Sequence, residues 1–190
     1  MCTKNKKLIY HLTALTNLKS ILQAGLLSRN MAAGFTDIAD SEIISFRKEH
    51  GLNDYVPFHF KSKNHFDGKV QKTYPEIEFI YITVSRKKAK QQQYKIIPCH
   101  PIACEPFQLY DYNEGFEMIN WDLIDERDYH KQDCRNASLA ECLTPNCVPF
   151  SDFSMIFCRN EATKSRVEKI LESEDLSITV NVNKEMFVKK

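Results

Sequence analysis

The sequence is poor in glycine and lacks the glycine-rich motifs that bind nucleotides in many enzymes. Only 5 of its 190 residues are glycine and 7 are proline, which excludes a collagen-like or linker-dominated chain. It contains no Gly-x-Gly-x-x-Gly, no Walker loop and no Gly-x-Ser-x-Gly segment. The familiar dinucleotide-binding, P-loop and α/β-hydrolase signatures are therefore absent, and any catalytic chemistry must come from other residues.

Long hydrophobic runs are also missing. A membrane-spanning helix needs about 20 mostly apolar residues, and the apolar runs here extend over only a few positions. The basic N-terminal residues are followed by His11, Thr13, Thr16 and Asn17 instead of a sustained apolar segment, so no signal peptide is predicted. From these two absences we expect a cytoplasmic protein that has no membrane partner.

No Cys-x-x-Cys motif occurs among the seven cysteines. An odd number of cysteines without a signal peptide indicates reduced thiols in a cytosol. Two pairs, Cys99/Cys104 and Cys142/Cys147, are each five positions apart, a spacing that matches common zinc sites poorly. We therefore expect reduced thiols and no metal site.

The net charge is close to zero for the whole chain but not for its halves. The formal charge is +1, yet residues 1–100 carry 16 Lys and Arg against 8 Asp and Glu, and residues 101–190 carry 10 against 17. The halves therefore have net charges of +8 and −7. Such an asymmetry is a reason to look for a polyanion site, although an unevenly charged, solvated surface is the simpler explanation from composition alone.

Length and composition predict a single globular domain over residues 1–190. Hydrophobic residues make up 43% and charged residues 27% of the chain, which argues against disorder, and single cores usually stop growing only near ~250 residues. Strand and helix patterns mix without a regular βαβ period, which favours an α+β fold over a doubly wound one.

Local patterns predict most of the individual elements. A helix is expected after an N-cap at Thr16 and ends at Gly25. Residues 55–60 alternate aromatic and other side chains, as an edge strand would, and residues 105–135 suggest a long excursion with short helices. Residues 137–143 fit a helix or a strand. The other expected strands are 8–10, 79–84, 95–97, 155–158 and 177–182, and the other expected helices are 41–50 and 160–173.

One carboxylate stands out by its surroundings. Glu141 lies within Ser138-Leu139-Ala140-Glu141-Cys142-Leu143, and a carboxylate in such an apolar segment is costly unless it is paired or solvated in a cleft. A surface glutamate on an amphipathic helix is the alternative. His11, after a buried-looking strand, and Arg47, in a short helix, are further candidates, although a core or capping histidine and a surface arginine explain them equally well.

Several segments, in their order along the chain, resemble the family of DarT-type ADP-ribosyltransferases. The opening segment Tyr10-His11-Leu12-Thr13, with Asn17-Leu18, Ser20-Ile21-Leu22 and Gly25-Leu26-Leu27 behind it, is similar to the start of that family. Residues 55–60 are similar to the family's YVPFYF segment, and Arg47 stands where the family places its arginine. The later matches are Trp121-Asp122, Ala140-Glu141-x-Leu143 and Val148-Pro149-Phe150-Ser151. The resemblance covers residues 8–170.

This resemblance implies an ADP-ribosyltransferase-like split β-sheet core with surrounding helices. It implies that NAD is the co-substrate, without a metal, and that ADP-ribose is attached to a base of single-stranded DNA. Family members are toxins, so a macrodomain-type antitoxin that removes ADP-ribose is implied as a partner. The alternatives are an inactive nucleic-acid-binding module of the same fold and an ADP-ribosyltransferase that acts on RNA or protein.

The resemblance also assigns roles to particular residues. It makes Glu141 the catalytic carboxylate at the ribose and Arg47 a second catalytic residue that contacts NAD. Because a guanidinium is effectively always charged, we expect Arg47 to stabilise charge or orient the base and not to abstract a proton. The cofactor-binding residues that the resemblance implies are His11, Leu12, Thr13, Ser20, Leu27, Arg47, Phe58 and Phe60.

The segment that leads to Glu141, residues 105–140, corresponds to the family's substrate-recognition loop. Tyr110 and Tyr112 are candidates for stacking on an unpaired base, and Lys61 and Lys63 are candidates for contacts to phosphates. Packing of the loop onto the protein body and a solvated lysine surface explain the same residues equally well.

Overall fold

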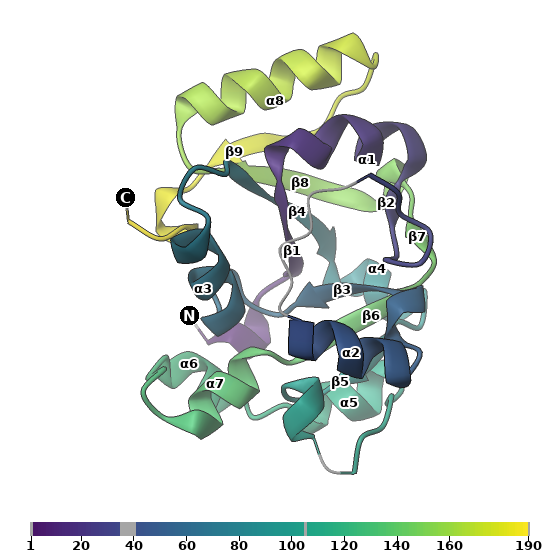
Figure 1. The fold of residues 1–190 in the computed structure, drawn as a ribbon, viewed down its shortest axis with the longest axis vertical. Helices are drawn as coiled ribbons and strands as arrows, with labels where there is room; N and C mark the ends of the chain where they lie inside the picture. Colours follow the sequence, from purple (N-terminus) through teal and green to yellow (C-terminus); the bar gives the residue numbers. More distant parts are fainter. Residues whose placement is uncertain (1, 35–40, 105, 190) are drawn as a thin grey trace.

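The computed structural model describes residues 2–34, 41–104 and 106–189, and at its centre is a seven-stranded sheet (Figure 1). The strands lie in the order β5-β6-β3-β1-β4-β8-β9, and all neighbours are antiparallel except β8 and β9. The strands of this sheet are β1 (Leu8–Ala14), β3 (Tyr55–His59), β4 (Phe79–Ser85), β5 (Lys95–Ile97), β6 (Glu141–Pro145), β8 (Phe153–Cys158) and β9 (Val180–Val182). The expected mixed α+β class is confirmed.

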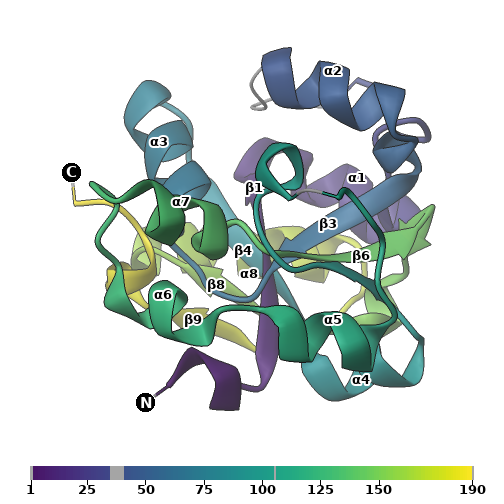
Figure 2. The same ribbon diagram turned by 90° about the horizontal axis from the view of Figure 1, so that it is seen from below.

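Helices cover both faces of the sheet. Helices α2 and α3 lie on one side of it, and α4 and α5 lie on the other (Figures 1 and 2). The helices are α1 (Leu18–Ala24), α2 (Ser41–Glu49), α3 (His65–Thr73), α4 (Arg86–Gln91), α5 (Tyr112–Met118), α6 (Trp121–Glu126), α7 (Gln132–Ser138) and α8 (Glu161–Ser173). The sequence patterns predict α2, α8 and the short helices after residue 105. They miss α3 and α4, which the side chains of Asn64 and Ser85 cap.

The main apolar core lies on one face of the sheet. Ile9, Val56, Phe58 and Ile82 are fully buried there and pack with residues of α1, α4, α5 and α8. Side chains alternate between the two faces along a strand. Every second residue of β3, including His59, therefore faces away from this core and toward the side that α2 and α3 cover.

The sheet splits between β1 and β3. Strand β1 pairs with β4 along its whole length but with β3 only where Tyr10 lies opposite His59. Beyond this point the imidazole of His11 reaches across, and its Nδ1 lies 2.8 Å from the carbonyl oxygen of Pro57. The expected split-sheet core is thereby confirmed.

The expectation that residues 55–60 form an edge strand is wrong, because β3 lies between β6 and β1. Proline is normally confined to edges because it has no N–H to donate to a ladder. The Pro57 carbonyl points toward β1, where it accepts the hydrogen bond from His11. The nitrogen and the carbonyl of one residue lie on the same side of a strand, so the Pro57 nitrogen also points toward β1. The ladder is already interrupted on this side, so the missing donor costs no strand pairing.

The end of α1 depends on a glycine. Gly25 has φ = 85°, and a Cβ atom there would collide with Sγ of Cys147 and lie 2.9 Å from the carbonyl oxygen of Val148. This close approach lets β2 (Leu26–Leu27) pair with β7 (Cys147–Val148) in a second, two-stranded sheet. Gly25 ends the helix as predicted. Thr16, however, lies within a 3₁₀ turn, and Asn17 occupies the N-cap position.

Three other boundaries differ from the sequence prediction. Strand β1 continues to Ala14, so His11 and Thr13 lie within the strand and do not follow it. Residues 137–143 are divided between the two predicted states, since α7 ends at Ser138 and β6 begins at Glu141. Strand β9 is shorter than predicted and begins only at Val180.

The expectation that all seven cysteines are reduced is wrong. Cys99 and Cys104 form a disulfide, and the other five cysteines are free. The 3₁₀ turn Pro101–Ala103 lies between Cys99 and Cys104 and brings their side chains together. Among the described residues, no group of three or more His, Cys, Asp or Glu side chains is arranged to hold a metal ion. The helices within these residues are also too short or too polar to cross a membrane.

Candidate active site

Two cavities adjoin at β3, and both are lined by Arg29, Arg47, Pro57 and Phe66. The larger cavity has a volume of about 440 Å³ and extends along β1 and α1. The smaller cavity has a volume of about 330 Å³ and lies among β3, β6, α2, α3 and α7. A ligand group in one cavity can therefore meet a group in the other beside Arg47.

Arg47 and Glu141 form a buried ion pair where the two cavities meet. Nη1 of Arg47 lies 2.7 Å from Oε2 of Glu141, and each side chain is only 8% exposed. Nη2 of Arg47 also donates to the carbonyl oxygen of Leu52 at 3.1 Å. Helix α2 supplies the arginine and the first residue of β6 supplies the carboxylate. The structure thus brings the two predicted catalytic residues together, and a charge-assisted hydrogen bond fixes their orientation.

His11 is held neutral in the wall of the larger cavity. Its Nδ1 faces the carbonyl oxygen of Pro57, which can only accept, so Nδ1 carries the proton and Nε2 carries a lone pair. The pKa of His11 is lowered to about 4, mainly by burial; the hydrogen bond to Pro57 opposes this shift, and the His59 and Arg47 charges add to it. At neutral pH this imidazole accepts a hydrogen bond without repelling a cation.

Four more of the predicted NAD-binding residues line the same larger cavity. These residues are Leu12, Thr13, Ser20 and Leu27. The hydroxyl of Thr13 accepts a hydrogen bond from Nδ2 of Asn17 (3.2 Å), and the hydroxyl of Ser20 donates to the Asn17 carbonyl oxygen (2.8 Å). The fold therefore assembles them beside His11 and Arg47, with small polar groups and aliphatic groups in one wall.

Phe58 and Phe60 lie beneath the site and line neither cavity. The ring of Phe58 contacts His11 edge to face, with 5.8 Å between the ring centroids. Phe60 is enclosed by the Trp121 ring at 5.4 Å and by the Arg86 guanidinium at 5.1 Å. Both aromatics support the site through packing, and the structure places neither where a ligand in the described cavities would touch it.

The smaller cavity is strongly basic. Glu141 is the one carboxylate among its described lining residues. The basic or titratable residues in the lining are Arg29, Arg47, His59, His65, Lys69, His100 and Arg135. Sequence analysis names Arg47 as a site residue and does not bring the others together into one site, because they come from separate elements and no local pattern joins them. Such a lining fits an anionic, hydrogen-bonding ligand.

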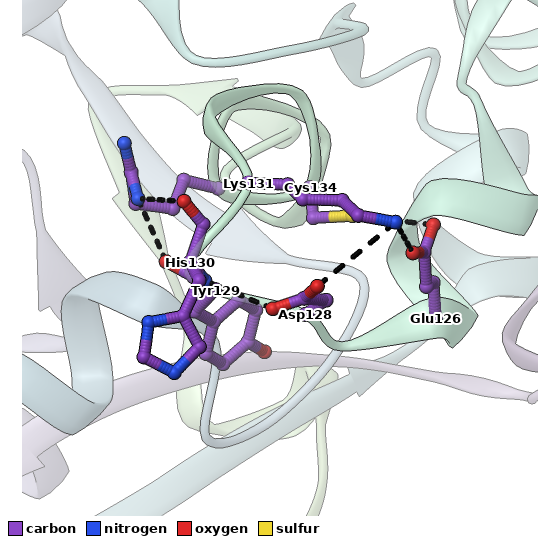
Figure 3. Close-up of polar contacts among 7 residues, drawn as sticks. Glu126, Asp128, Tyr129, His130, Lys131 and Cys134 are labelled. Atoms are coloured by element: carbon purple, nitrogen blue, oxygen red, sulfur yellow. Dashed lines mark hydrogen bonds and ion pairs between the residues drawn. The ribbon is translucent and has the colours of Figure 1, made fainter.

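Polar contacts join the turn between α6 and α7 to α7 (Figure 3), and α7 supplies Gln132, Arg135 and Asn136 to the lining of the smaller cavity. Nη1 of Arg135 donates to the carbonyl oxygens of Tyr129 (2.7 Å) and His130 (3.0 Å). In the same turn the Lys131 ammonium pairs with Glu126. These contacts stay within one segment, so the turn acts as a unit. Within the described residues, the partners of the Arg135 guanidinium are neutral oxygens, which leaves its charge available to an anion.

The two predicted phosphate-binding lysines line neither cavity. Lys61 is 3% exposed, and its ammonium donates to the carbonyl oxygen of Ile124. Burial, with a smaller contribution from the Arg127 charge, lowers the pKa of Lys61 to about 8. The backbone N–H of Lys63 donates to the Tyr81 hydroxyl at 2.9 Å. Lys61 therefore has a packing role in this structure, and the described contacts of Lys63 are made by its backbone.

The two predicted base-stacking tyrosines also lie outside both cavities. Tyr112 is buried, and its ring stacks on Phe116 with 5.8 Å between the centroids. Tyr110 bridges to Ile96 through the backbone. These positions match the alternative in which the loop packs onto the protein body.

The basic first half and the acidic second half of the chain pair with each other. Ion pairs join Lys4 to Glu117, Lys19 to Glu174, Lys88 to Asp152 and Lys95 to Asp111. The charge asymmetry of the sequence is thus partly neutralised across the fold. The cluster of basic residues at the smaller cavity is the stronger sign of a polyanion ligand.

The fold is similar to several solved structures. Thermus sp. 2.9 DarT in complex with ADP-ribosylated ssDNA matches with a TM-score of 0.83 and 20% identity over 96% of each chain. Thermus sp. 2.9 DarT in complex with NAD⁺ matches at 0.79 and 18%, over 97% of this chain and 98% of that one. Thermosipho africanus DarTG in complex with ADP-ribose matches at 0.77 and 21%, over 96% of this chain and 51% of that one. At these identities the likeness shows a shared fold.

A family model covers nearly the whole chain, although a search of curated proteins found no match. The model is described as ssDNA thymidine ADP-ribosyltransferase, DarT, and it matches residues 10–188. This range contains the Arg47–Glu141 pair and all the described residues that line the two cavities. The chain therefore belongs to the DarT family of ssDNA thymidine ADP-ribosyltransferases.

Proposed function

We propose that this protein transfers ADP-ribose from NAD to a thymine base of single-stranded DNA, with NAD in the larger cavity and the base in the smaller one. The observation that carries this proposal is the buried Arg47–Glu141 pair at the junction of the two cavities. A carboxylate at that point can act on a ribose carbon while an acceptor approaches it from the other side.

The larger cavity suits the nicotinamide end of NAD. The nicotinamide ring of NAD is cationic, and His11 is neutral at physiological pH because burial lowers its pKa to about 4. Nε2 of His11 can accept a hydrogen bond from the carboxamide or from a ribose hydroxyl. Thr13 and Ser20 add hydroxyl groups, and Leu27 adds an apolar surface.

Glu141 supplies the electrostatic part of the reaction. Cleavage of the bond between nicotinamide and ribose passes through an oxocarbenium-like centre, as in glycoside hydrolysis. A carboxylate held at the ribose binds a hydroxyl group and stabilises the positive charge that develops there. Arg47 keeps this carboxylate oriented through the 2.7 Å ion pair, and its own permanent charge excludes it as a base.

The smaller cavity suits a nucleotide acceptor. Its many cationic and imidazole groups attract phosphates, and the Arg135 guanidinium is held at the wall by neutral partners. We place the base beside Glu141 and the backbone of the strand along Arg135 and Lys69.

A protein with this activity damages the DNA of its own cell, so we propose that it is the toxin of a toxin–antitoxin pair. Its partner would be a macrodomain-type antitoxin that removes ADP-ribose, and both would act in the cytoplasm. Growth arrest on expression of the wild type, and not of Glu141→Gln, tests the toxin role. Release of DNA-bound ADP-ribose by a purified macrodomain hydrolase tests the partner class.

The test of the activity is transfer from labelled NAD to oligonucleotides that differ at one position. We expect label on an oligonucleotide with a single thymidine and none on the same strand with deoxycytidine at that site. Glu141→Gln should lower the transfer rate by about 10²–10³-fold, as loss of one group that stabilises transition-state charge does in other enzymes. Glu117→Gln is the matched control, because Glu117 is 69% exposed and pairs with Lys4 far from the cavities.

Equal labelling of both oligonucleotides would contradict the proposed base. Labelling of RNA or protein in place of DNA would contradict the proposed acceptor class. If Glu141→Gln behaved like Glu117→Gln, Glu141 would not be the catalytic carboxylate.

A further inference from the structure

His59 lies directly across the sheet from Glu141. The two residues are register partners in the antiparallel pair formed by β3 and β6. Such partners point to the same face of a sheet, with Cβ atoms roughly 4.5–5.5 Å apart. His59 is partly buried and lines the smaller cavity together with Glu141 and Arg47. Its imidazole is therefore at the acceptor side of the proposed reaction centre.

The hydrogen bonds of His59 define which ring nitrogen carries the proton. Nδ1 lies 3.1 Å from the carbonyl oxygen of Ala140, and because a carbonyl oxygen only accepts, Nδ1 is the donor. Nε2 of the neutral ring then carries a lone pair. Among the described residues, no protein group donates to Nε2, so this lone pair is available to a ligand in the cavity.

The proposed transfer needs a group that accepts a proton. This requirement rests on the proposed function: thymine in a DNA strand has its N1 bonded to deoxyribose, so its one nitrogen-bound proton is on N3. A new bond from N3 to the ribose carbon of NAD forms as the bond to nicotinamide breaks. The electron pair of the broken bond leaves with nicotinamide, and the N3 proton must go to a base.

We propose that His59 is the general base of the acceptor side and takes the N3 proton on Nε2. The other groups near the reaction centre are less suited to this role. Arg47 is permanently charged, and Glu141 is ion-paired to Arg47 and is needed at the ribose. His11 lines the larger cavity. His65 also lines the smaller cavity, but its ring packs on Tyr129, with 5.8 Å between the centroids, whereas His59 is the register partner of Glu141.

Titratable and charged groups on four elements surround His59. Glu141 of β6 and Asp67 of α3 are the acidic groups near it, Arg47 of α2 is the basic group, and His11 of β1 is neutral at physiological pH. Asp67 is buried, and its Oδ2 accepts a hydrogen bond from the Tyr81 hydroxyl at 2.8 Å. A proton taken up by Nε2 thus has two carboxylates nearby.

The test is the transfer rate of His59→Asn as a function of pH, with the binding of NAD measured in parallel. The asparagine Nδ2 can still donate to the Ala140 carbonyl oxygen, whereas the base is removed. We expect the maximal transfer rate to fall by about 10²-fold, within the usual range for loss of a general base, with NAD affinity unchanged. The rise of the wild-type rate on deprotonation of a single group should disappear. His50→Asn is the matched control and should keep the wild-type pH profile, because Nδ1 of His50 also lies at a backbone carbonyl oxygen and His50 lines neither cavity.

A more acidic acceptor separates a base from a residue that only positions the strand. 5-Bromo-2′-deoxyuridine has bromine in place of the methyl group of thymidine, with similar size and a more acidic N3–H. The deficit of His59→Asn relative to the wild type should therefore be smaller with this acceptor. A purely positioning role would leave the deficit the same for both acceptors.

A His59→Asn rate within about threefold of the wild type, or an unchanged pH profile, would overturn the role of His59 and leave the proposed function intact. A wild-type protein that transfers nothing to either acceptor would overturn both. If His59→Asn does not fold, His59→Gln tests the same prediction, since its amide at the Nε2 position cannot take up a proton. Unfolding midpoints measured alongside establish that each variant is folded.

Discussion

A buried ion pair and two histidines with fixed ring orientations line the two cavities at β3. The Arg47–Glu141 pair is almost fully buried, and such a pair is costly to form because both ions lose their hydration. A catalytic or ligand-binding role therefore explains this ion pair in the cavity wall better than a contribution to the stability of the fold. The imidazoles of His11 and His59 are each oriented by a backbone carbonyl oxygen, so each presents Nε2 to a different cavity.

Removing one partner of this ion pair should destabilise the fold more than removing both. Arg47→Met leaves the buried Glu141 carboxylate without a counter-charge, and we expect the free energy of unfolding to fall by about 3–5 kcal/mol. The double variant Arg47→Met/Glu141→Leu should recover most of this loss while remaining inactive. Urea unfolding of the three proteins measures both effects. Equal destabilisation in the single and double variants would mean that the pair is not effectively buried.

The depressed pKa of His11 predicts how acid affects stability and NAD binding. Burial lowers this pKa from 6.5 to about 4. Between these two pH values His11 is protonated in the unfolded chain and neutral in the folded protein. The contribution of His11 to stability is complete above pH 6.5 and is lost as the pH falls toward 4. NAD affinity should stay level down to about pH 5 and decline below it, because an imidazolium loses its lone pair and repels the nicotinamide.

NAD titrations and urea unfolding between neutral and acidic pH measure these two effects. His11→Gln is the control, since it should show a weaker loss of stability in the same pH window. An NAD affinity that falls with a midpoint near 6.5 would show that the pKa of His11 is not lowered.

Among the secondary-structure elements, the separation of β1 from β3 and the end of α1 shape the site. Strands β1 and β3 separate after one paired position, and the hydrogen bond from His11 to Pro57 takes the place of a ladder. Helix α1 ends at Gly25, so that β2 can pair with β7 at the rim of the larger cavity. The backbone conformation of this one residue thus shapes part of the proposed NAD site.

Gly25→Ala should therefore be strongly destabilising. The residue has φ = 85°, and a Cβ atom would meet Sγ of Cys147 and the Val148 carbonyl oxygen. We expect a loss of about 2 kcal/mol or more in the free energy of unfolding. Gly68→Ala in α3 is the matched control, because nothing lies within 4 Å of its Cβ position, and it should stabilise the helix by roughly 0.5–1 kcal/mol. Similar effects of the two substitutions would contradict this account.

At the scale of the whole molecule, charges that are segregated in the sequence are brought together by the fold. Lysines of the first half pair with carboxylates of the second half at several sites. A separate cluster of basic residues surrounds the smaller cavity, where residues from β3, α3 and α7 meet. The attraction of a DNA strand should therefore come from this cluster and not from the first half as a whole.

The salt dependence of oligonucleotide binding distinguishes these two origins. Arg135→Gln should weaken binding and reduce the slope of log affinity against log salt by about 0.7–1, the value for one lost phosphate contact. Lys95→Gln should leave the slope unchanged, since Lys95 pairs with Asp111 at 2.5 Å and lies outside the described cavities. Fluorescence anisotropy of a labelled oligonucleotide at several salt concentrations measures both slopes. The reverse order of effects would show that the strand binds elsewhere.

Local patterns predict the elements well wherever neighbours in the sequence decide them. The apolar strand over residues 79–84 and the amphipathic helix over residues 160–173 are examples, and both occur close to the predicted bounds. The edge-strand prediction for residues 55–60 fails because position in a sheet depends on partners far along the chain. Lys61 fails as a surface lysine for a similar reason: its burial beneath α6 is decided by residues some 60 positions away.

The α+β class, the family resemblance and the candidates Glu141, Arg47 and His11 follow from the sequence alone, because they depend on local periodicity and on short ordered motifs. Only the tertiary structure decided that Arg47 meets Glu141 at the junction of two cavities and that His59 stands opposite Glu141. It also decided which lysines are neutralised and which basic residues gather around the smaller cavity. The physical reason is that strand pairing and charge burial join residues from distant parts of the chain, and no local pattern records those partners.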